Sequence, residues 1–259
     1  MKRLALLGYC LLLSGLTLWA NTSQCLREVV DLRGNWEFAL DPDGKGDLEQ
    51  WWKNRLVETV ILPGTTDSNK KGIANTNKSE TTYLSRYYKY EGVAWYSRNI
   101  EIPASWEGKH IVLFLERTRP STVWIDGQEV GKNNYLSTPQ EYDLTHFLTP
   151  GSHKLTIRID NGKSIPKQIR SSSHACTEST QTNWNGIIGR IELQAMNPLF
   201  IESIQTFPSV ADRSVKVKIT LSKEYGINGK QIRLSAAAFN SSRKHKVKAT
   251  EDALKEGWK

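Results

Sequence analysis

The side chains best suited to bind a ligand lie in two long polar segments, residues 65–91 and 161–184. Ordering connections of this length costs conformational entropy, so a compact domain seldom keeps them without a use. Two amides flank an indole at the end of the second segment; amides hydrogen-bond hydroxyl groups, and an exposed tryptophan face stacks on ring-shaped ligands. The candidate residues are Asp67, Asn69, Glu80, Arg86, Tyr87, Asn183, Trp184 and Asn185. The alternative is a surface connection without a ligand, in which Trp184 plugs the end of the domain and the amides shape a turn.

Patterns typical of catalytic and metal sites are absent from the sequence. The five histidines show neither metal spacing nor a nucleophile partner, and no G-x-S-x-G motif is present. Isolated acids such as Glu116 and Glu129 fall in strand or turn patterns. We therefore assign no catalytic residue, no metal ligand and no cofactor to this chain.

The elements that must position these segments are strands, and the clearest run through residues 92–131. An alternating stretch ends at Pro103, an apolar run covers residues 110–116, and a third strand covers residues 122–126. Asp126-Gly127 then suits the positive φ angles of a tight hairpin turn. We expect these three consecutive strands to form the centre of one antiparallel sheet.

Further strands flank this centre on both sides. We predict one alternating strand over residues 29–41, with Trp36 and Phe38 on one face. Four others are expected over residues 57–62, 142–148, 153–160 and 189–196. Nine or so strands with long connections predict an all-β fold, a jelly-roll (galactose-binding-like) β-sandwich over residues 21–196.

The remaining residues, 197–259, predict a second and incomplete domain. Strand patterns recur over residues 200–204, 215–221 and 231–236, and the pattern then fades. An immunoglobulin-like sandwich needs about 100 residues and seven strands. We therefore expect a partial immunoglobulin-like β-sandwich here.

The first twenty residues differ in kind from the rest. Lys2 and Arg3 precede an apolar run, and Ala20 offers a cleavage point, so residues 1–20 are interpreted as a signal peptide. This predicts an exported protein, periplasmic or extracellular, with no membrane contact after cleavage; an uncleaved anchor is the alternative. Cleavage leaves Cys25 and Cys176, whose spacing leaves open whether they form a bridge.

The net charge of +8 is concentrated at the two ends of the chain. Residues 213–259 hold 12 Lys or Arg against 4 Asp or Glu, so the patterned domain itself is nearly neutral. A nucleic-acid interface needs basic residues interleaved with aromatic ones, whereas here they lie in different places. We expect no nucleic-acid partner.

The ordered series of motifs resembles the amino-terminal sugar-binding domain of glycoside hydrolase family 2, which includes β-galactosidases, β-glucuronidases and β-mannosidases. The resemblance covers about residues 32–194. It rests on Trp95-Tyr96, then V-W-I-D-G-Q-E-V-G, then Y-D-L-T, L-T-P-G-S-H and G-I-I-G-R. It implies a carbohydrate ligand and hydrolysis of terminal β-linked sugars, with retention, by a full-length relative.

The resemblance also implies where the chemistry lies. In this family two glutamates on a separate α/β barrel act as acid/base and nucleophile. Nothing in this sequence alternates strands and helices as that barrel does, so we expect this chain alone to be inactive. The family's loop before the last G-I strand contacts the sugar, which selects Asn183, Trp184 and Asn185. Asp67 and Arg86 join them as candidates from the other polar segment, on the length and polarity of that segment. Family β-galactosidases carry an acid just before the Trp; Gln181, Thr182 and Asn183 stand here, so a bound cation is not implied.

Two other function classes remain open on the sequence. One is a free-standing carbohydrate-binding or interaction module without catalysis, and the other is a purely structural sandwich. Neither the preferred sugar nor its linkage follows from the sequence, because the barrel supplies much of that selection.

Overall fold

The computed structural model describes residues 27–76, 86–172, 174, 176–177, 180, 182–212, 214–222, 231–234, 237–239, 244–246 and 250–253. The expected signal peptide, Cys25 and Glu80 lie outside the described residues. Among the residues described, none of the helices has the length and apolar character needed to cross a bilayer.

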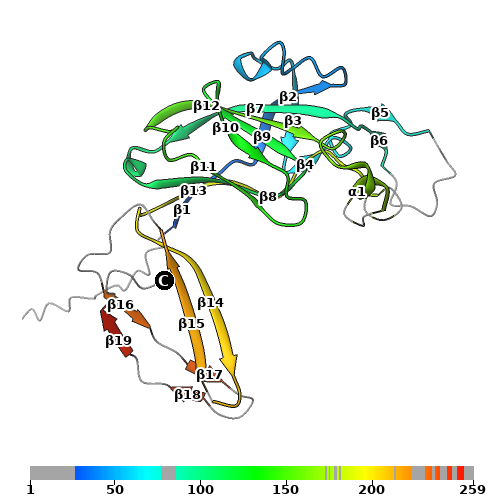
Figure 1. Ribbon diagram of the computed structural model, residues 1–259. Coiled ribbons are helices and arrows are strands. Elements are labelled where there is room, and N and C mark those ends of the chain that lie inside the picture. The colour runs from blue at the N-terminus through cyan, green and yellow to red at the C-terminus, as the bar shows by residue number, and fades with distance from the viewer. Residues whose placement is uncertain are drawn as a thin grey trace, which may run out of the picture.

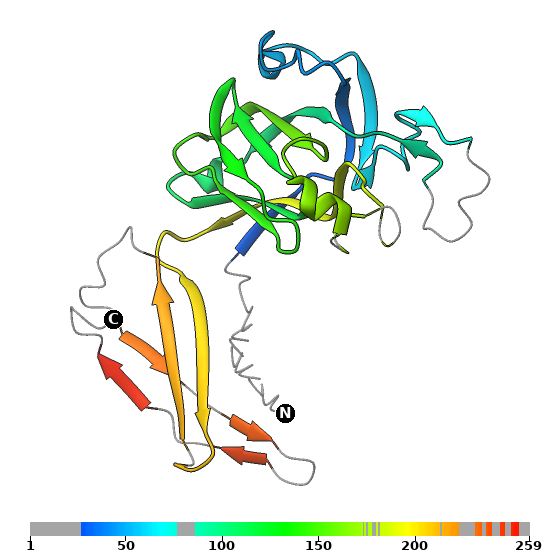
Figure 2. The same cartoon turned by 45° about the vertical axis from the view of Figure 1, so that its right-hand side comes forward.

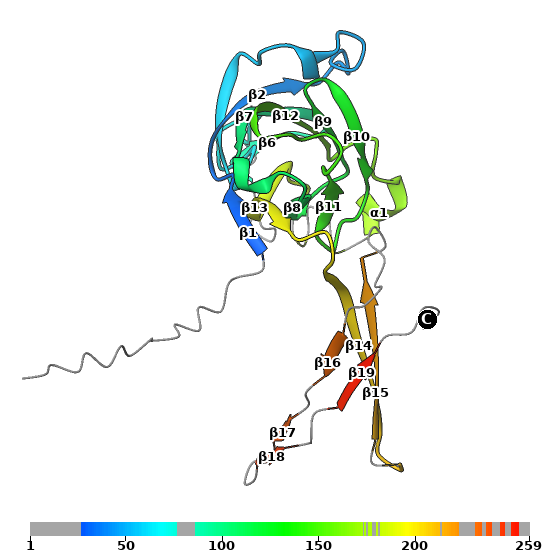
Figure 3. The same cartoon turned by 90° about the vertical axis from the view of Figure 1, so that its left-hand side faces the viewer.

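Two antiparallel sheets face each other to form a β-sandwich (Figure 1; Figure 3). The six-stranded sheet runs in the order β10 (Gln128–Asn133), β9 (Ser121–Ile125), β12 (Gly151–Asp160), β7 (Val93–Ile102), β2 (Gly34–Asp41) and β3 (Glu58–Leu62). The five-stranded sheet runs β1 (Arg27–Asp31), β13 (Gly186–Met196), β8 (His110–Thr118) and β11 (Gln140–Asp143), with β4 (Gly64–Thr65) paired to β13. The prediction of an all-β jelly-roll sandwich is confirmed.

One apolar core lies between the two sheets. Alternate residues of β12, Leu155, Ile157 and Ile159, are fully buried and meet the inward residues of β8 and β13. Trp36 and Phe38 join the same core, as their shared face predicted. Burial of this alternating set drives the sheets together, because each buried side chain contributes about 1.5–3 kcal/mol.

Two strand predictions were wrong. Residues 29–41 form two strands in different sheets, because the chain crosses between them at Leu32, whose amide donates to the carbonyl of Ile191 at 2.9 Å. Gly34, at φ 121°, makes the bend. Likewise β8 does not lie beside β7 and β9, but in the centre of the opposite sheet.

The predicted hairpin turn is confirmed and carries an additional contact. Asp126 and Gly127 adopt φ angles of 49° and 84° between β9 and β10. The Asp126 carboxylate lies 2.6 Å from Nδ1 of His153, whose Nε2 lies 2.7 Å from the carbonyl oxygen of Thr149. Burial alone would lower the pKa of His153, but these two hydrogen bonds outweigh it and raise the pKa.

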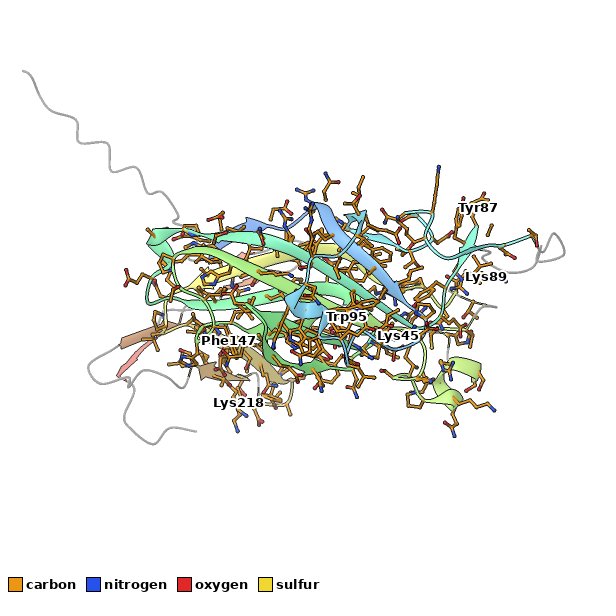
Figure 4. The ribbon with its side chains drawn as sticks, turned by 90° about the horizontal axis from the view of Figure 1, so that it is seen from above. Lys45, Tyr87, Lys89, Trp95, Phe147 and Lys218 are labelled. Atoms are coloured by element: carbon orange, nitrogen blue, oxygen red, sulfur yellow. The ribbon has the colours of Figure 1, made fainter. Side chains whose placement is uncertain are left out.

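The connection from β2 to β3 folds over the outer face of the six-stranded sheet, and its short 3₁₀ helix spans Trp51–Lys53. Trp51 and Trp52 pack there on Trp95 of β7 and Trp124 of β9, a separate group from the central core. We call these four residues the tryptophan cluster. Figure 4 shows Trp95 beneath this helix, near the middle of the sandwich.

The polar segments also acquire short elements. Segment 65–91 holds a small two-stranded sheet of β5 (Ile73–Ala74) and β6 (Tyr88–Lys89), and segment 161–184 holds the helix α1 (Lys167–Ser172). Cys176 is a buried free thiol in the described structure.

Beyond β13 the residues that the structure describes form three two-stranded antiparallel sheets. They are β14 (Ile201–Ser209) with β15 (Ser214–Leu221), β16 (Gln231–Leu234) with β19 (Thr250–Ala253), and β17 (Ala237–Phe239) with β18 (Lys244–Lys246). The long β14–β15 hairpin extends away from the sandwich (Figure 2). Strands therefore lie where the sequence pattern predicted them, and β14 is longer than expected; the domain boundary at residue 197 stays a prediction.

Candidate functional site

The loop of residues 182–185 enters β13 at one end of the sandwich. Its last residue, Asn185, accepts a hydrogen bond at its main-chain oxygen from the amide of Thr66, at 2.8 Å. Gly186 follows at φ 137° and pairs with Thr65 of β4. A Cβ atom on Gly186 would collide with the carbonyl oxygen of Gly64, so this close approach requires glycine.

Asn185 is fully buried and fixes the loop to the core strands. Its Oδ1 accepts a hydrogen bond from the hydroxyl of Tyr96, at 2.9 Å. Its Nδ2 donates to the carbonyl oxygens of Gly92 and Ile159, each at 3.1 Å. Burial raises the pKa of Tyr96, so its hydroxyl stays protonated and remains a donor. The side chain that the sequence assigned to a ligand is thus engaged inside the protein.

Asn183 and Asn161 continue this internal network. Asn161 Nδ2 donates to the carbonyl of Asn183 at 2.8 Å, and Asn183 Nδ2 donates to the carbonyl of Asn161 at 2.8 Å. Asn161 Oδ1 accepts from the amide of Gly92 at 3.0 Å and from Asn185 Nδ2 at 3.3 Å. We call Asn161, Asn183 and Asn185 the amide network. In the described part of the chain the loop backbone pairs with no neighbouring strand, and buried backbone groups need hydrogen-bond partners. The amide network supplies such partners.

Two buried arginines hold the same loop by its carbonyl groups. Arg86 donates from Nη1 to the oxygen of Asn183 at 2.6 Å. Arg119 donates from Nε to the oxygen of Trp184 at 3.1 Å and from Nη2 to that of Thr182 at 3.3 Å. Burial lowers the pKa of Arg119 to about 10, so the guanidinium stays charged at neutral pH. The two guanidinium groups therefore fix the course of the loop main chain from inside the sandwich.

Trp184 is the member of the loop that reaches solvent. Its side chain is half-buried, and the Arg119 guanidinium lies over its ring, 4.3 Å from the centroid. The arrangement is intermediate between the exposed platform and the buried plug that the sequence left open. Of the predicted residues in this loop, Trp184 alone presents a side chain that a ligand could meet without displacing an internal hydrogen bond.

Three other predicted residues that the structure describes lie near the same end of the sandwich but differ in accessibility: Asp67, Asn69 and Tyr87. The half-buried Asp67 accepts from the amide of Tyr88 at 2.7 Å and so holds the small β5–β6 sheet. The side chain of Asn69 accepts a hydrogen bond from the amide of Ile61 and donates one to its carbonyl oxygen. It thus pairs with the open edge of β3 as a neighbouring strand would. Tyr87 is 82% exposed and points outward at the edge of the molecule (Figure 4).

No group of His, Cys, Asp and Glu side chains suited to a metal ion occurs within the part of the chain that the structure describes. Glu116 bonds the side chain of Arg190 at 2.9 Å, and this contact lowers the pKa of the glutamate. Glu129 lies 3.4 Å from Lys132 in an ion pair. These acids therefore have the structural surroundings that their strand positions predicted.

Sequence reasoning missed Arg119 and Asn161. Arg119 follows an apolar strand and precedes a proline, and Asn161 begins a polar segment, so both look like ordinary connection residues. The pairing of β13 with β8 brings Arg119 to the loop, and the end of β12 in the opposite sheet brings Asn161 there.

The comparison with known families decides the identity of the sandwich. A profile described as Glycosyl hydrolases family 2, sugar binding domain, matches residues 29–193. The chain belongs to glycosyl hydrolase family 2. The matched region of this family 2 chain runs from β1 into β13 and therefore spans both sheets of the sandwich.

Curated relatives and solved structures agree with this assignment. A β-glucuronidase of Paenibacillus borealis is 29% identical over 203 residues, covering 73% of this chain and 32% of the relative. A β-galactosidase of Oenococcus oeni is 23% identical over 239 residues, covering 86% and 22%. A β-glucuronidase structure from an uncultured Clostridium sp. superposes with a TM-score of 0.61 at 19% identity, covering 87% of this chain and 39% of that one. That likeness shows the fold, and this family 2 chain spans about a third or less of the length of these curated relatives.

Proposed function

We propose that this chain is the non-catalytic, sugar-binding portion of an exported family 2 glycoside hydrolase that acts on terminal β-linked sugars of glycans. The observation that carries the proposal is the family match over the whole sandwich, in a chain that spans about a third of its β-glucuronidase relative. The two catalytic carboxyl groups would belong to an α/β barrel, the partner that this sandwich serves.

In this proposal the loop of residues 182–185 forms one wall of the sugar site at the mouth of the barrel. Trp184 offers the stacking surface, since its ring is the part of the loop that reaches solvent. Three buried side chains fix the backbone of the loop from inside the sandwich: Asn183, Asn185 and Arg86. Asp67 orders the neighbouring β5–β6 sheet. A fixed loop favours catalysis because a sugar held in one orientation has less freedom to lose on reaction.

Export to the periplasm or the medium rests on residues 1–20. Expression of the full chain in a secreting host should yield a mature protein that begins at Asn21, as measured by intact mass. Retention of residues 1–20 in a membrane fraction would favour the anchor instead.

The absence of catalysis is tested on the purified chain. Nitrophenyl β-galactoside, β-glucuronide and β-mannoside should each be hydrolysed at the buffer rate, because in this proposal the two catalytic carboxyl groups belong to the α/β barrel and not to the sandwich. Turnover well above that rate on any of them would overturn the proposal. The coding sequence beyond codon 259 distinguishes a hydrolase portion from a free-standing binding module. A reading frame that continues into a barrel supports the hydrolase, and a stop codon with no barrel after it supports the binding module.

A further inference from the structure

A hollow lies on the outer face of the six-stranded sheet, away from the core. Its volume is about 700 Å³, within the range of about 300–1,000 Å³ that small-molecule sites occupy. Its lining includes two indole rings and four charged side chains: Trp52, Trp124, Asp47, Glu129, Lys132 and Arg158. We call this the outer pocket, and its lining includes none of residues 182–185.

The strand register explains why these side chains meet. On the outer face Trp124 of β9 lies opposite Glu129 of β10, and Thr122 lies opposite both Lys132 and Arg158. A register shift between Glu129 and Gly131 brings both Glu129 and Lys132 to this face. The connection from β2 to β3 adds Asp47 and Trp52 from above.

The wall formed by this connection is fixed in place. Asp41, itself buried, accepts hydrogen bonds from the amides of Lys45 at 2.7 Å and Gly46 at 2.9 Å, and from Nε1 of Trp95 at 3.1 Å. Gly46 fits closely, since a Cβ atom there would overlap the Trp95 ring. A preformed pocket loses little conformational entropy when a ligand binds.

Aromatic rings form the apolar part of the lining. Trp52 stacks on Trp124 with ring centroids 5.1 Å apart and planes within 5°. Trp124 is almost completely buried, whereas Trp52 is half-buried and keeps part of its ring accessible. The sandwich already has a complete core on the other side of the sheet, so this second group is not needed to seal it.

The charged groups of the lining cancel in pairs. Arg158 lies 3.3 Å from Asp47, and Lys132 lies 3.4 Å from Glu129. Two cations and two carboxylates leave no net charge to attract a phosphate or a uronate. The same groups offer donors and acceptors side by side, which suits hydroxyl groups.

We propose that the outer pocket is a carbohydrate-binding site for a neutral pyranose unit of a glycan. The apolar face of the sugar ring lies against Trp52, and its hydroxyl groups bond the two ion pairs. The site is additional to the loop at residues 182–185 and does not depend on the function proposed for that loop. Its role is to hold a glycan on the sandwich by a unit other than the one that reacts.

The test is a titration of the full chain, labelled with ¹⁵N, with lactose, cellobiose and mannobiose, followed through the indole N–H resonances of tryptophan. We expect neutral sugars to shift the resonances of Trp52 and Trp124 and to leave that of Trp184 in place. Glu129→Gln removes one carboxylate and should weaken neutral-sugar binding about tenfold, or about 1.4 kcal/mol. It should also admit inorganic phosphate, because Lys132 then lacks its counter-charge. Glu141→Gln, an exposed carboxylate on β11 of the other sheet, is the matched control.

The outcomes divide cleanly. Trp52→Ala should abolish the shifts while the far-ultraviolet circular dichroism of the protein is retained, and Trp184→Ala should leave them unchanged. Shifts that survive both Trp52→Ala and Glu129→Gln but vanish in Trp184→Ala would overturn the proposal and place sugar binding in the loop. Tight binding of phosphate or glucuronate to the unchanged chain would overturn the neutral-ligand assignment, and so would the absence of any shift with the three sugars.

Discussion

Replacing Asn185 by alanine should destabilise the sandwich severely, although the residue is polar and belongs to a loop. The change removes the partner of the buried Tyr96 hydroxyl and one hydrogen bond each from the carbonyls of Gly92 and Ile159. A buried polar group left without a partner costs about 1–3 kcal/mol, and carbonyls retain a second lone pair. We therefore expect a loss of about 3–5 kcal/mol, a large share of the about 5–15 kcal/mol that domains usually have.

Urea unfolding followed by tryptophan fluorescence measures this loss, since most tryptophans lie in the sandwich. With a slope of about 2 kcal/mol per molar urea, the midpoint should fall by about 2 M. Asn99→Ala, an exposed asparagine on β7, is the matched control and should change the midpoint little. Equal midpoints for the two variants would refute the assignment of a structural role to the buried amide.

Asn185→Asp sharpens the same test. Aspartate keeps an oxygen for Tyr96 but cannot donate to the two carbonyls, and its charge is unfavourable in a buried site. The variant should therefore be less stable than wild type at neutral pH and recover part of the loss on acidification, when the carboxyl group takes up a proton. A variant that is as stable as wild type at neutral pH would contradict the geometry.

Three further perturbations test other parts of the structure. The pKa of His153 is raised in the folded protein, so its ion pair with Asp126 stabilises the protein below the ordinary pKa of about 6.5. This stabilisation is lost as pH rises through the pKa of the folded state. The melting temperature of wild type should therefore fall more between about pH 6 and about pH 8 than that of Asp126→Asn. Trp184→Ala should cost only about 1–2 kcal/mol, since the ring is half-buried and the stacked guanidinium contributes about 0.5–2 kcal/mol; a loss of about 3–5 kcal/mol in thermal melts would instead identify a buried plug. Gly186→Ala should lower the melting temperature strongly because its Cβ meets backbone, whereas Gly131→Ala, with open space at its Cβ, should not.

Much of the fold follows from local rules. The Asp126-Gly127 turn was predictable because its positive φ angles are a property of two neighbouring residues. The burial of Trp36 and Phe38 in one core was predictable because strand alternation places both on one face. The sheet membership of β8 was not predictable in this way. An apolar strand fits the centre of either sheet, and only pairing with the distant β13 decides between them.

The site was less predictable than the fold for a physical reason. An asparagine in a polar segment has the same local signature whether it faces solvent or replaces missing backbone hydrogen bonds. Asn185 proved to do the second, through contacts with residues 24 to 93 positions away. The tryptophan cluster shows the same limit, since sequence spacing does not reveal that Trp52 stacks on Trp124.

The amide network separates the atoms that shape the loop from the atoms that could meet a ligand. Asn161, Asn183 and Asn185 hold the main chain from inside the sandwich, whereas the side chain of residue 184 faces outward. Mutation at position 184 can therefore change the outer surface of the loop while the path of the backbone is inherited intact. Under the proposed function, such a division would let a lineage change its glycan by single substitutions, without first evolving a new loop conformation.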